Sequence, residues 1–294
     1  MLQTPIDNNK QTGQTKDTML KVSTVQTVIR FDLARTLAGR GRYWTTAYLL
    51  DGVLIDSGCA HTAPELVKAL DGKRLTHIIN THTHEDHIGT NGPLQRQCAH
   101  LEILAHPLAI PVLEDPHGRI HLHPYRRLFW GWPEPSHANP LADETWIETN
   151  NLRLQVLYTP GHSPDHICLY EPEHGWLFTG DLFVGGWERA LREGYDIWQI
   201  IASLKRVNTY PATVIFPGSA HIRENPKTEL EEKIAYLEEF GSKVLTLHSR
   251  GWELNAIVRA LCGKPMFIEL ITLGNFARRH LVLSYLGVYE NKAS

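Results

Sequence analysis

HIINTHTHEDHIGTNG, residues 77–92, places four side chains that can bind a metal within six positions: His82, His84, Asp86 and His87. They follow an apolar run and precede a glycine. A strand that runs straight into such a segment holds these side chains at the rigid edge of a sheet, where loop residues can converge. Two histidines at i and i+2 of an extended segment point to the same side and can bind one ion. The segment therefore predicts a metal site after a short buried strand, with Asp86 and His87 available to a second ion.

Three further residues that can bind a metal follow strand-like runs later in the chain: His162 in YTPGHSPDH, Asp181 in LFTGDLF and His221 in FPGSAHI. Each by itself is an ordinary turn or loop residue. Loop residues at the strand ends of an α/β sheet meet in one crevice, so together with the first segment they predict a single site. A second His-x-His, at His121 and His123, occurs in a chain of 17 histidines and is interpreted as a pair of non-ligands.

Apolar runs and turn signals around these residues predict an α/β layered architecture. YWTTAYLL and VLIDSG, joined by Asp51-Gly52, predict a β-hairpin with a two-residue turn. APELVKAL has helical spacing and follows Thr62, a residue type that caps helices. The other expected elements are strands over 76–80 and 101–106, a helix over 195–207, and strands that end just before His162, Asp181 and His221.

Residues 107–140 interrupt this pattern with a segment that is rich in proline, histidine and aromatic residues and has no sustained period. A long irregular insertion in a compact domain is more often functional than accidental. Its aromatic side chains, and one that follows it, are expected either to form the apolar wall of a substrate pocket or to fill core. They are Tyr125, Phe129, Trp130, Trp132 and Trp146.

Three segments differ in composition. Residues 1–22 are polar and predict a flexible N-terminal tail, whereas residues 23–225 contain every candidate metal ligand and predict one domain. Residues 226–294 change to helical patterns and predict a helical C-terminal region. Apolar positions recur there at near-helical spacing, so the region is expected to pack beside the site and help select the substrate without supplying a ligand.

The 294-residue chain has the composition of a globular protein, with 42% hydrophobic and 21% charged residues. A formal charge of −3 gives no general attraction to a polyanion and disfavours a nucleic-acid partner. The four cysteines are widely spaced and are expected to be reduced. The start of the chain lacks the apolar stretch of a secretory signal, and no run reaches the ~18 apolar residues of a membrane span. The sequence predicts a cytoplasmic protein with a small-molecule substrate and no membrane contact, and leaves its oligomeric state open.

His82, His84, Asp86 and His87 match the motif His-x-His-x-Asp-His, on which the sequence resembles the metallo-β-lactamase superfamily over roughly residues 25–225. The resemblance implies a four-layer αββα sandwich with the site at one edge and the helical C-terminal region as an appendage. It also implies that Asp56, in the matching segment VLIDSG, supports the ligands from behind. By the same resemblance, the first metal is held by His82, His84 and His162, the second by Asp86, His87 and His221, and Asp181 bridges the two.

Two positions depart from the pattern of many family members. Their last histidine directly follows Pro-Gly, whereas here Ser219 and Ala220 stand between that dipeptide and His221. Asp181 stands where class B1 β-lactamases place a cysteine, so the pattern is more similar to glyoxalase II and the lactonases. Antibiotic hydrolysis is therefore not the expected activity.

The donor types favour zinc, with two ions per chain, and leave iron or manganese as alternatives. Zinc lowers the pKa of a bound water to ~7 and polarises a carbonyl oxygen, so that a metal-bound hydroxide attacks the substrate. Asp86 is the expected catalytic residue, because it can orient this hydroxide or take its proton. We expect a metal-dependent hydrolase of a small ester-like substrate, a thioester or a lactone.

Other functions of similar proteins stay open. A helical segment after the domain also occurs in lactamase-like endoribonucleases, and the arginine pairs Arg126-Arg127 and Arg278-Arg279 would suit a phosphodiesterase. Persulfide dioxygenases have the same ligand types but bind one iron through two histidines and an aspartate. A degenerate binding protein is disfavoured because all seven candidate ligands are present.

Overall fold

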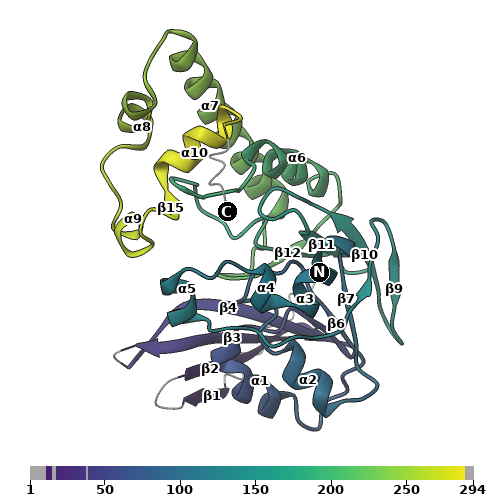
Figure 1. The fold of residues 1–294 in the computed structure, drawn as a ribbon. Helices are drawn as coiled ribbons and strands as arrows, with labels where there is room; N and C mark the ends of the chain where they lie inside the picture. Colours follow the sequence, from purple (N-terminus) through teal and green to yellow (C-terminus); the bar gives the residue numbers. More distant parts are fainter. Residues whose placement is uncertain (1–10, 15–17, 38, 289–294) are drawn as a thin grey trace.

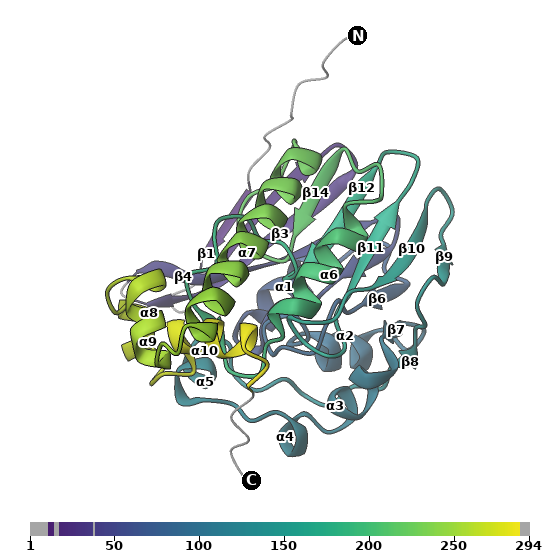
Figure 2. The same cartoon turned by 90° about the horizontal axis from the view of Figure 1, so that it is seen from above.

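The computed structural model describes residues 11–14, 18–37 and 39–288. Two β-sheets pack face to face at its centre, and helices cover both outer faces (Figures 1 and 2). The predicted αββα sandwich is therefore confirmed. Among the described residues, no helix has the length and apolar character that crossing a membrane requires.

Within residues 11–14, 18–37 and 39–288, the first sheet has eight strands in the order in which they occur in the chain. Its first five strands are antiparallel and the remainder parallel. The predicted hairpin turns at Asp51-Gly52, whose φ angles of 41° and 85° suit a two-residue turn with both residues left-handed. The strands are β1 (Gln11–Gln14), β2 (Thr18–Val25), β3 (Val28–Leu37), β4 (Arg40–Leu50), β5 (Val53–Ile55), β6 (His77–Ile79), β7 (Glu102–Ala105) and β8 (Asn139–Pro140).

The second sheet has the order β14-β12-β11-β10-β9, and a separate two-stranded sheet joins β13 to β15. β12 and β14 are parallel and are connected through a helix, as in a βαβ unit. The strands are β9 (Trp146–Glu148), β10 (Arg153–Tyr158), β11 (Ile167–Glu171), β12 (Trp176–Gly180), β13 (Leu191–Arg192), β14 (Val214–Pro217) and β15 (Phe276–Ala277).

Three groups of buried side chains fill the spaces between the four layers. The outer layers are α1 (Ala63–Leu70) and α2 (Asn91–Gln97) on one side and α6 (Ile197–Val207) and α7 (Pro226–Ser249) on the other. Leu66 packs under the first sheet, Ile79 and Phe178 lie between the sheets, and Leu204 packs over the second sheet. Each sheet is thus apolar on both faces, which explains the near-continuous apolar runs of its central strands.

Helix α6 shows how the sequence specifies one of these layers. The Asp196 side chain accepts hydrogen bonds from the backbone N–H groups of Trp198 and Gln199, both at 3.0 Å, and so caps the helix. Ile200 and Leu204, at i and i+4, are buried against the second sheet. The cap fixes the point at which the loop that follows β12 enters the helix.

The prediction of a flexible tail over residues 1–22 is wrong for its described part. β1 and β2 belong to the first sheet, and β2 pairs with β3 from Thr18 to Val25. Backbone pairing needs no apolar side chains, so the polar composition concealed these strands. Alternation marks β2 nevertheless, because Leu20 is buried against α1 and Lys21 is exposed. Residues 1–10 and 15–17 lie outside the described residues.

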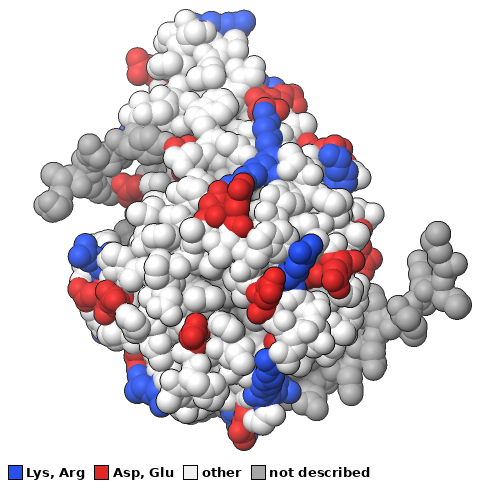
Figure 3. Space-filling view, turned by 90° about the vertical axis from the view of Figure 1, so that its right-hand side faces the viewer, with Lys and Arg blue, Asp and Glu red and all other residues white. Residues whose placement is uncertain are grey.

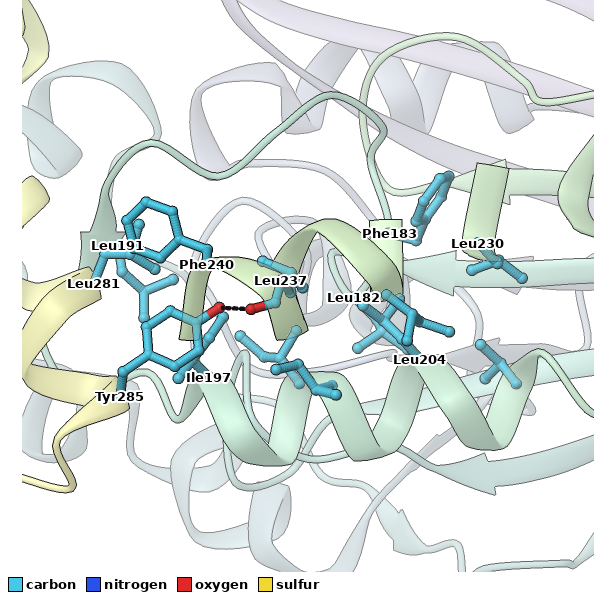
Figure 4. Packing of buried hydrophobic residues seen from close by; sticks show 14 of the residues in the cluster. Leu182, Phe183, Leu191, Ile197, Leu204, Leu230, Leu237, Phe240, Leu281 and Tyr285 are labelled. Carbon is cyan, nitrogen blue, oxygen red and sulfur yellow. Dashed lines mark hydrogen bonds between the residues drawn. The ribbon is translucent and has the colours of Figure 1, made fainter. Parts of the chain in front are cut away.

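The C-terminal region is helical from Pro226, as predicted, and its described part ends at residue 288. Besides α7 it contains α8 (Leu254–Cys262), α9 (Phe267–Ile271) and α10 (Arg278–Tyr285), of which α8 and α9 project beyond the layered body in Figure 1. Its buried side chains share one core with α6. Figure 4 shows Leu237 of α7, where the backbone oxygen accepts a hydrogen bond of 2.7 Å from the Tyr285 hydroxyl of α10. α7 is therefore a structural layer of the sandwich.

Residues 107–140 contain more regular structure than the sequence predicts. The segment begins with a 3₁₀ turn at Pro107–Ala109, and the short helices α3 (Ile110–Glu114), α4 (Pro116–Arg119) and α5 (Pro124–Phe129) follow it. An earlier 3₁₀ turn, Ala60–Thr62, lies outside the segment and precedes α1. Each of these α-helices has a proline in its first two positions, where the missing N–H costs nothing. Helices of four to six residues are too short to show a period in the sequence.

Candidate metal centre

Asp56, in the loop after β5, fixes the segment that carries the motif. Its buried carboxylate accepts hydrogen bonds from the Thr81 backbone N–H at 2.7 Å, the Thr81 hydroxyl at 2.8 Å and His87 Nδ1 at 2.7 Å. Because a carboxylate only accepts, His87 donates through Nδ1, which leaves Nε2 as the atom that would bind a metal. Burial would lower the pKa of His87, but the charges of Asp56, Asp181 and Asp86 outweigh it and raise the pKa well above its usual range, so the ring is cationic here and would give up its Nε2 proton to an ion. Since the Thr81 hydroxyl donates to Asp56, it accepts from His82 Nδ1 at 3.0 Å, which likewise leaves His82 Nε2 available.

Three imidazole nitrogens converge on one point beside this segment. His84 Nδ1 lies 2.9 Å from His82 Nε2 and 3.0 Å from His162 Nε2. Burial, with the charge of neighbouring His87, lowers the pKa of His82 well below its usual range, and burial lowers the pKa of His162 to about 3. Neutral imidazole is the form that binds metals, so His82, His84 and His162 form a group suited to one ion, here called the first group.

His87 and Asp181 form a second group with His82. The distances from Asp181 Oδ1 to His87 Nε2 and from Asp181 Oδ2 to His162 Nε2 are 3.5 Å and 3.6 Å. Burial would raise the pKa of Asp181, but the charge of His87 outweighs it and holds the pKa below its usual range. The carboxylate of Asp181 is thus ionised and turns one oxygen toward each group.

Asp86 lies on the side of the second group. Its Oδ2 is 3.8 Å from His87 Nε2, and its Oδ1 is 3.9 Å from the Arg126 guanidinium. Burial is the largest influence on Asp86 and raises its pKa. Asp86 also lines a cavity of about 350 Å³ that opens beside both groups, so it can contact a bound molecule.

A model of the metallo-β-lactamase superfamily matches residues 45–219, more than half of the chain. The chain belongs to the metallo-β-lactamase superfamily. A probable hydroxyacylglutathione hydrolase of Schizosaccharomyces pombe is 31% identical over 219 residues, 72% of this chain and 68% of that relative. An atrochrysone carboxyl ACP thioesterase of Aspergillus fumigatus is 24% identical over 65% of this chain and 55% of that relative. The chain thus spans only about half to two thirds of the length of these superfamily members.

A solved structure from Thermus thermophilus, a metallo-β-lactamase family protein, is similar to the fold. Its TM-score is 0.61 at 22% identity, and the likeness covers 87% of this chain and 90% of that one. At this identity the likeness shows the fold alone. Because the likeness covers more of the chain than the superfamily match does, it extends to segments outside residues 45–219.

His221, predicted as a ligand of the second metal, does not join the metal-binding groups of this superfamily member. Its side chain is exposed, while Ser219 lines the cavity with Asp86. The backbone approaches the second group so closely that a Cβ on Gly218 would lie 2.7 Å from Asp181 Oδ1. The residue that directly follows Pro217-Gly218 is Ser219, and it lies beside the centre. Because Ser219 and Ala220 stand between Gly218 and His221, the histidine lies farther along the loop and away from the centre. This corrects the predicted ligand set.

His166 supports the centre and was not singled out from the sequence. It is fully buried, its Nε2 accepts a hydrogen bond of 3.2 Å from the Asp181 backbone N–H, and its Nδ1 donates to the Thr159 hydroxyl at 2.9 Å. The ring therefore fixes the backbone of Asp181 at the end of β12. Its place in YTPGHSPDH, four residues after His162, was the available signal.

The arginine pairs are not surface patches. Arg126 is buried and forms an ion pair with the buried Glu85, and Arg278 is buried and pairs with Glu269. Only the second arginine of each pair, Arg127 and Arg279, is exposed. On the face shown in Figure 3, lysine and arginine alternate with aspartate and glutamate. Neither pair therefore provides a basic surface for a phosphodiester backbone.

Part of the predicted aromatic wall is present. Tyr125 and Trp130 line the cavity, as do Tyr43, Trp44, Tyr195 and Phe276, which the sequence did not indicate. The other predicted members lie elsewhere. Phe129 packs on Tyr43 from outside the cavity, Trp132 stacks on His117, and Trp146 is exposed. His121 and His123 contact each other and lie in neither metal-binding group.

Proposed function

We propose that this protein is a metal-dependent hydrolase that cleaves a small ester-like substrate, a thioester or a lactone. The observation that carries the proposal is the convergence of the first group beside the 350 Å³ cavity, whose wall also contains Asp86. Such a cavity suits a small molecule, since ligand pockets are typically ~300–1,000 Å³. The relatives named as a thioesterase and a hydroxyacylglutathione hydrolase support a hydrolytic role.

The residues of the first group fit a zinc ion. Three neutral imidazoles, one buried and two half-buried, are a ligand set that zinc prefers, and one remaining position would stay open for catalysis. The second group fits an ion less well, because His82 also belongs to the first group and His221 lies apart, which leaves His87 and Asp181 with the Asp86 carboxylate beside them. We therefore propose a tight first site and a weaker second site whose donors are mostly oxygen.

A divalent ion bound here would supply an acidified water as nucleophile and polarise the carbonyl oxygen of the substrate. The residues of the chain do the remaining work. Asp86 would orient the attacking water or take its proton, because it lines the cavity beside His87. Asp56 holds the His87 ring with Nε2 turned away from it, and the aromatic side chains exclude bulk water from the cavity.

The alternative activities find less support. A phosphodiesterase that acts on a nucleic acid would need a basic surface for the backbone, whereas Arg126 and Arg278 of the two arginine pairs are engaged in buried ion pairs. A dioxygenase that binds one iron through two histidines and an aspartate would leave the third imidazole of the first group without a role. Metal identity decides between this activity and hydrolysis.

The test is metal analysis of protein purified without chelator, followed by a panel of thioester, lactone and phosphodiester substrates. We expect at least one zinc per chain and turnover of a thioester or a lactone. One iron, with oxygen consumption in the presence of glutathione persulfide, would contradict the proposal. Turnover of phosphodiesters alone would contradict it as well.

A further inference from the structure

Among the charged side chains that line the cavity, Arg192 differs from the others in its partners. Arg126 is compensated by Glu85, and Glu188 by Lys233. Within the described part of the chain, no carboxylate lies within ion-pair distance of the Arg192 guanidinium. An arginine is always charged and is costly to place in a partly enclosed site without an anion.

The contacts that Arg192 does make are weak ones for a guanidinium. Its NH1 lies 2.8 Å from His84 Nε2, and the group lies 5.9 Å from the centroid of the Tyr195 ring. Five N–H donors therefore meet three uncharged partners, the His84 ring nitrogen, the Tyr195 ring face and the Tyr195 hydroxyl. Most of the hydrogen-bonding capacity of Arg192 is free to meet a molecule in the cavity.

The bond to His84 also conflicts with the proposed role of that histidine. His84 turns Nδ1 toward the other two nitrogens of the first group, so Nδ1 would be the ligand atom and Nε2 would carry the proton. A guanidinium N–H and an imidazole N–H both donate and cannot bond to each other. When the first group holds an ion, Arg192 therefore loses this partner and still faces the cavity.

The backbone of Arg192 is held in place from the C-terminal region. β13 pairs with β15, with Arg192 opposite Phe276, and the Glu193 N–H donates to the Asn275 oxygen at 3.0 Å. Phe276 itself lines the cavity. A cationic side chain on a fixed strand, next to aromatic rings, is a recognition site for an anion with an apolar body.

We propose that Arg192 binds a carboxylate of the substrate, which therefore carries an acidic group besides its ester-like bond and has an apolar, ring-containing body. The planar guanidinium matches a carboxylate with two parallel hydrogen bonds. The aromatic residues Tyr43, Trp44 and Trp130 hold the body of the substrate. This inference rests on the proposed function for the scissile bond but not for the anion site.

The first test measures binding and needs no turnover. Zinc-loaded native protein is titrated calorimetrically with 2-naphthoate and with 2-naphthamide, which has the same shape without the charge. Arg192→Gln and Arg192→Lys are compared with the matched control Arg189→Gln, an exposed arginine on the same loop that does not line the cavity. Zinc content is measured for every variant.

We expect native protein and the control to prefer the naphthoate by about tenfold or more, as a charged bidentate partner implies. Arg192→Gln should lose this preference while keeping its zinc, and Arg192→Lys should retain part of it. Equal binding of the two probes by native protein would overturn the inference. An unchanged preference in Arg192→Gln would overturn it too, because the metal alone would then bind the carboxylate. If Arg192→Gln does not fold, the native preference and Arg192→Lys decide.

The second test separates this inference from the proposed function. Two aryl thioesters are compared, identical except that one bears a distal carboxylate and the other a carboxamide. Arg192→Gln should raise KM for the acidic thioester about tenfold and leave the neutral one unchanged. If native protein cleaves both equally well, the function stands and the acidic substrate fails. If it cleaves neither yet prefers the naphthoate, the function fails and the anion site stands.

Discussion

Asp56 shows how few residues orient the centre. Through one carboxylate it engages Nδ1 of His87, directly, and of His82, through Thr81, and so leaves Nε2 of both rings to face an ion. The motif and this aspartate were both recognised from the sequence, because each belongs to a short contiguous segment. The direction in which an isolated residue such as His221 points was not, since it depends on the path of the whole loop.

At the same scale, His84→Ala should remove the ion of the first group, because His84 Nδ1 is the atom on which the other two nitrogens converge. Metal content and activity should both fall to near zero. Asp86→Ala is expected to keep the first ion and lose most turnover. Elemental analysis measures the metal content of both variants, and a substrate assay measures their turnover. His123→Ala is the control, and its metal content should not change. Full metal content in His84→Ala would show that the first group is assigned wrongly.

Substitutions at Ser219 and His221 should have different effects on metal affinity at the second site. Ser219→His places an imidazole beside Asp86 and should tighten the second ion at least about tenfold. His221→Ala should leave both metal affinities unchanged, since the side chain is exposed. Zinc titration of the metal-free proteins, with one indicator dye, gives the stoichiometry. Loss of an ion in His221→Ala would restore His221 to the ligand set.

At the scale of elements, α7 and the β13–β15 pair decide how the C-terminal region relates to the site. α7 covers the second sheet, so a chain ending near residue 225 would expose the apolar face of α6. β15, which belongs to the C-terminal region, pairs with β13, the strand that carries Arg192. This pairing supports a role for the C-terminal region in substrate selection. The sequence predicted these helices from their periodicity, but a two-residue strand such as β15 has no pattern of its own.

Leu237 and Leu245, both in α7, test this layer. Leu237 is 1% exposed within the core shared with α6, whereas Leu245 is 43% exposed. Leu237→Ala should lower the free energy of unfolding by about 2–5 kcal/mol, the usual cost of a cavity in a core. Leu245→Ala should change it by less than about 0.5 kcal/mol. Urea unfolding measures both, and equal small losses would mean that α7 does not complete the sandwich.

At the scale of the whole molecule, the centre joins the two sheets. Asp56 and the motif follow β5 and β6 of the first sheet, while His162 and Asp181 follow β10 and β12 of the second. The residues of the first group thus come from both halves of the sandwich. An ion that binds only the folded chain stabilises all of it, because neither half forms the first group alone.

Removal of metal should therefore lower the melting temperature of the entire protein. A loss of about 3 kcal/mol, expected for a ligand present at ~100 times its dissociation constant, corresponds to a decrease of several degrees for a chain of this size. Scanning calorimetry before and after treatment with a chelator checks this. His84→Ala should be insensitive to the chelator. An unchanged melting temperature in the native protein would mean that the centre binds no ion as purified.

The αββα order of the layers was implied only by the resemblance to the superfamily. The sequence by itself determined the residue types of the candidate site, their spacing, an α/β layered architecture and the helical C-terminal region. These depend on local periodicity and on short segments that carry their chemistry wherever the chain folds. Tertiary structure alone decided that Ser219 instead of His221 faces the centre. It also decided that Arg126 is buried in an ion pair, and that Arg192 faces the cavity without a carboxylate partner in the described chain. Each of these depends on where distant segments meet, and no pattern within a single segment records that.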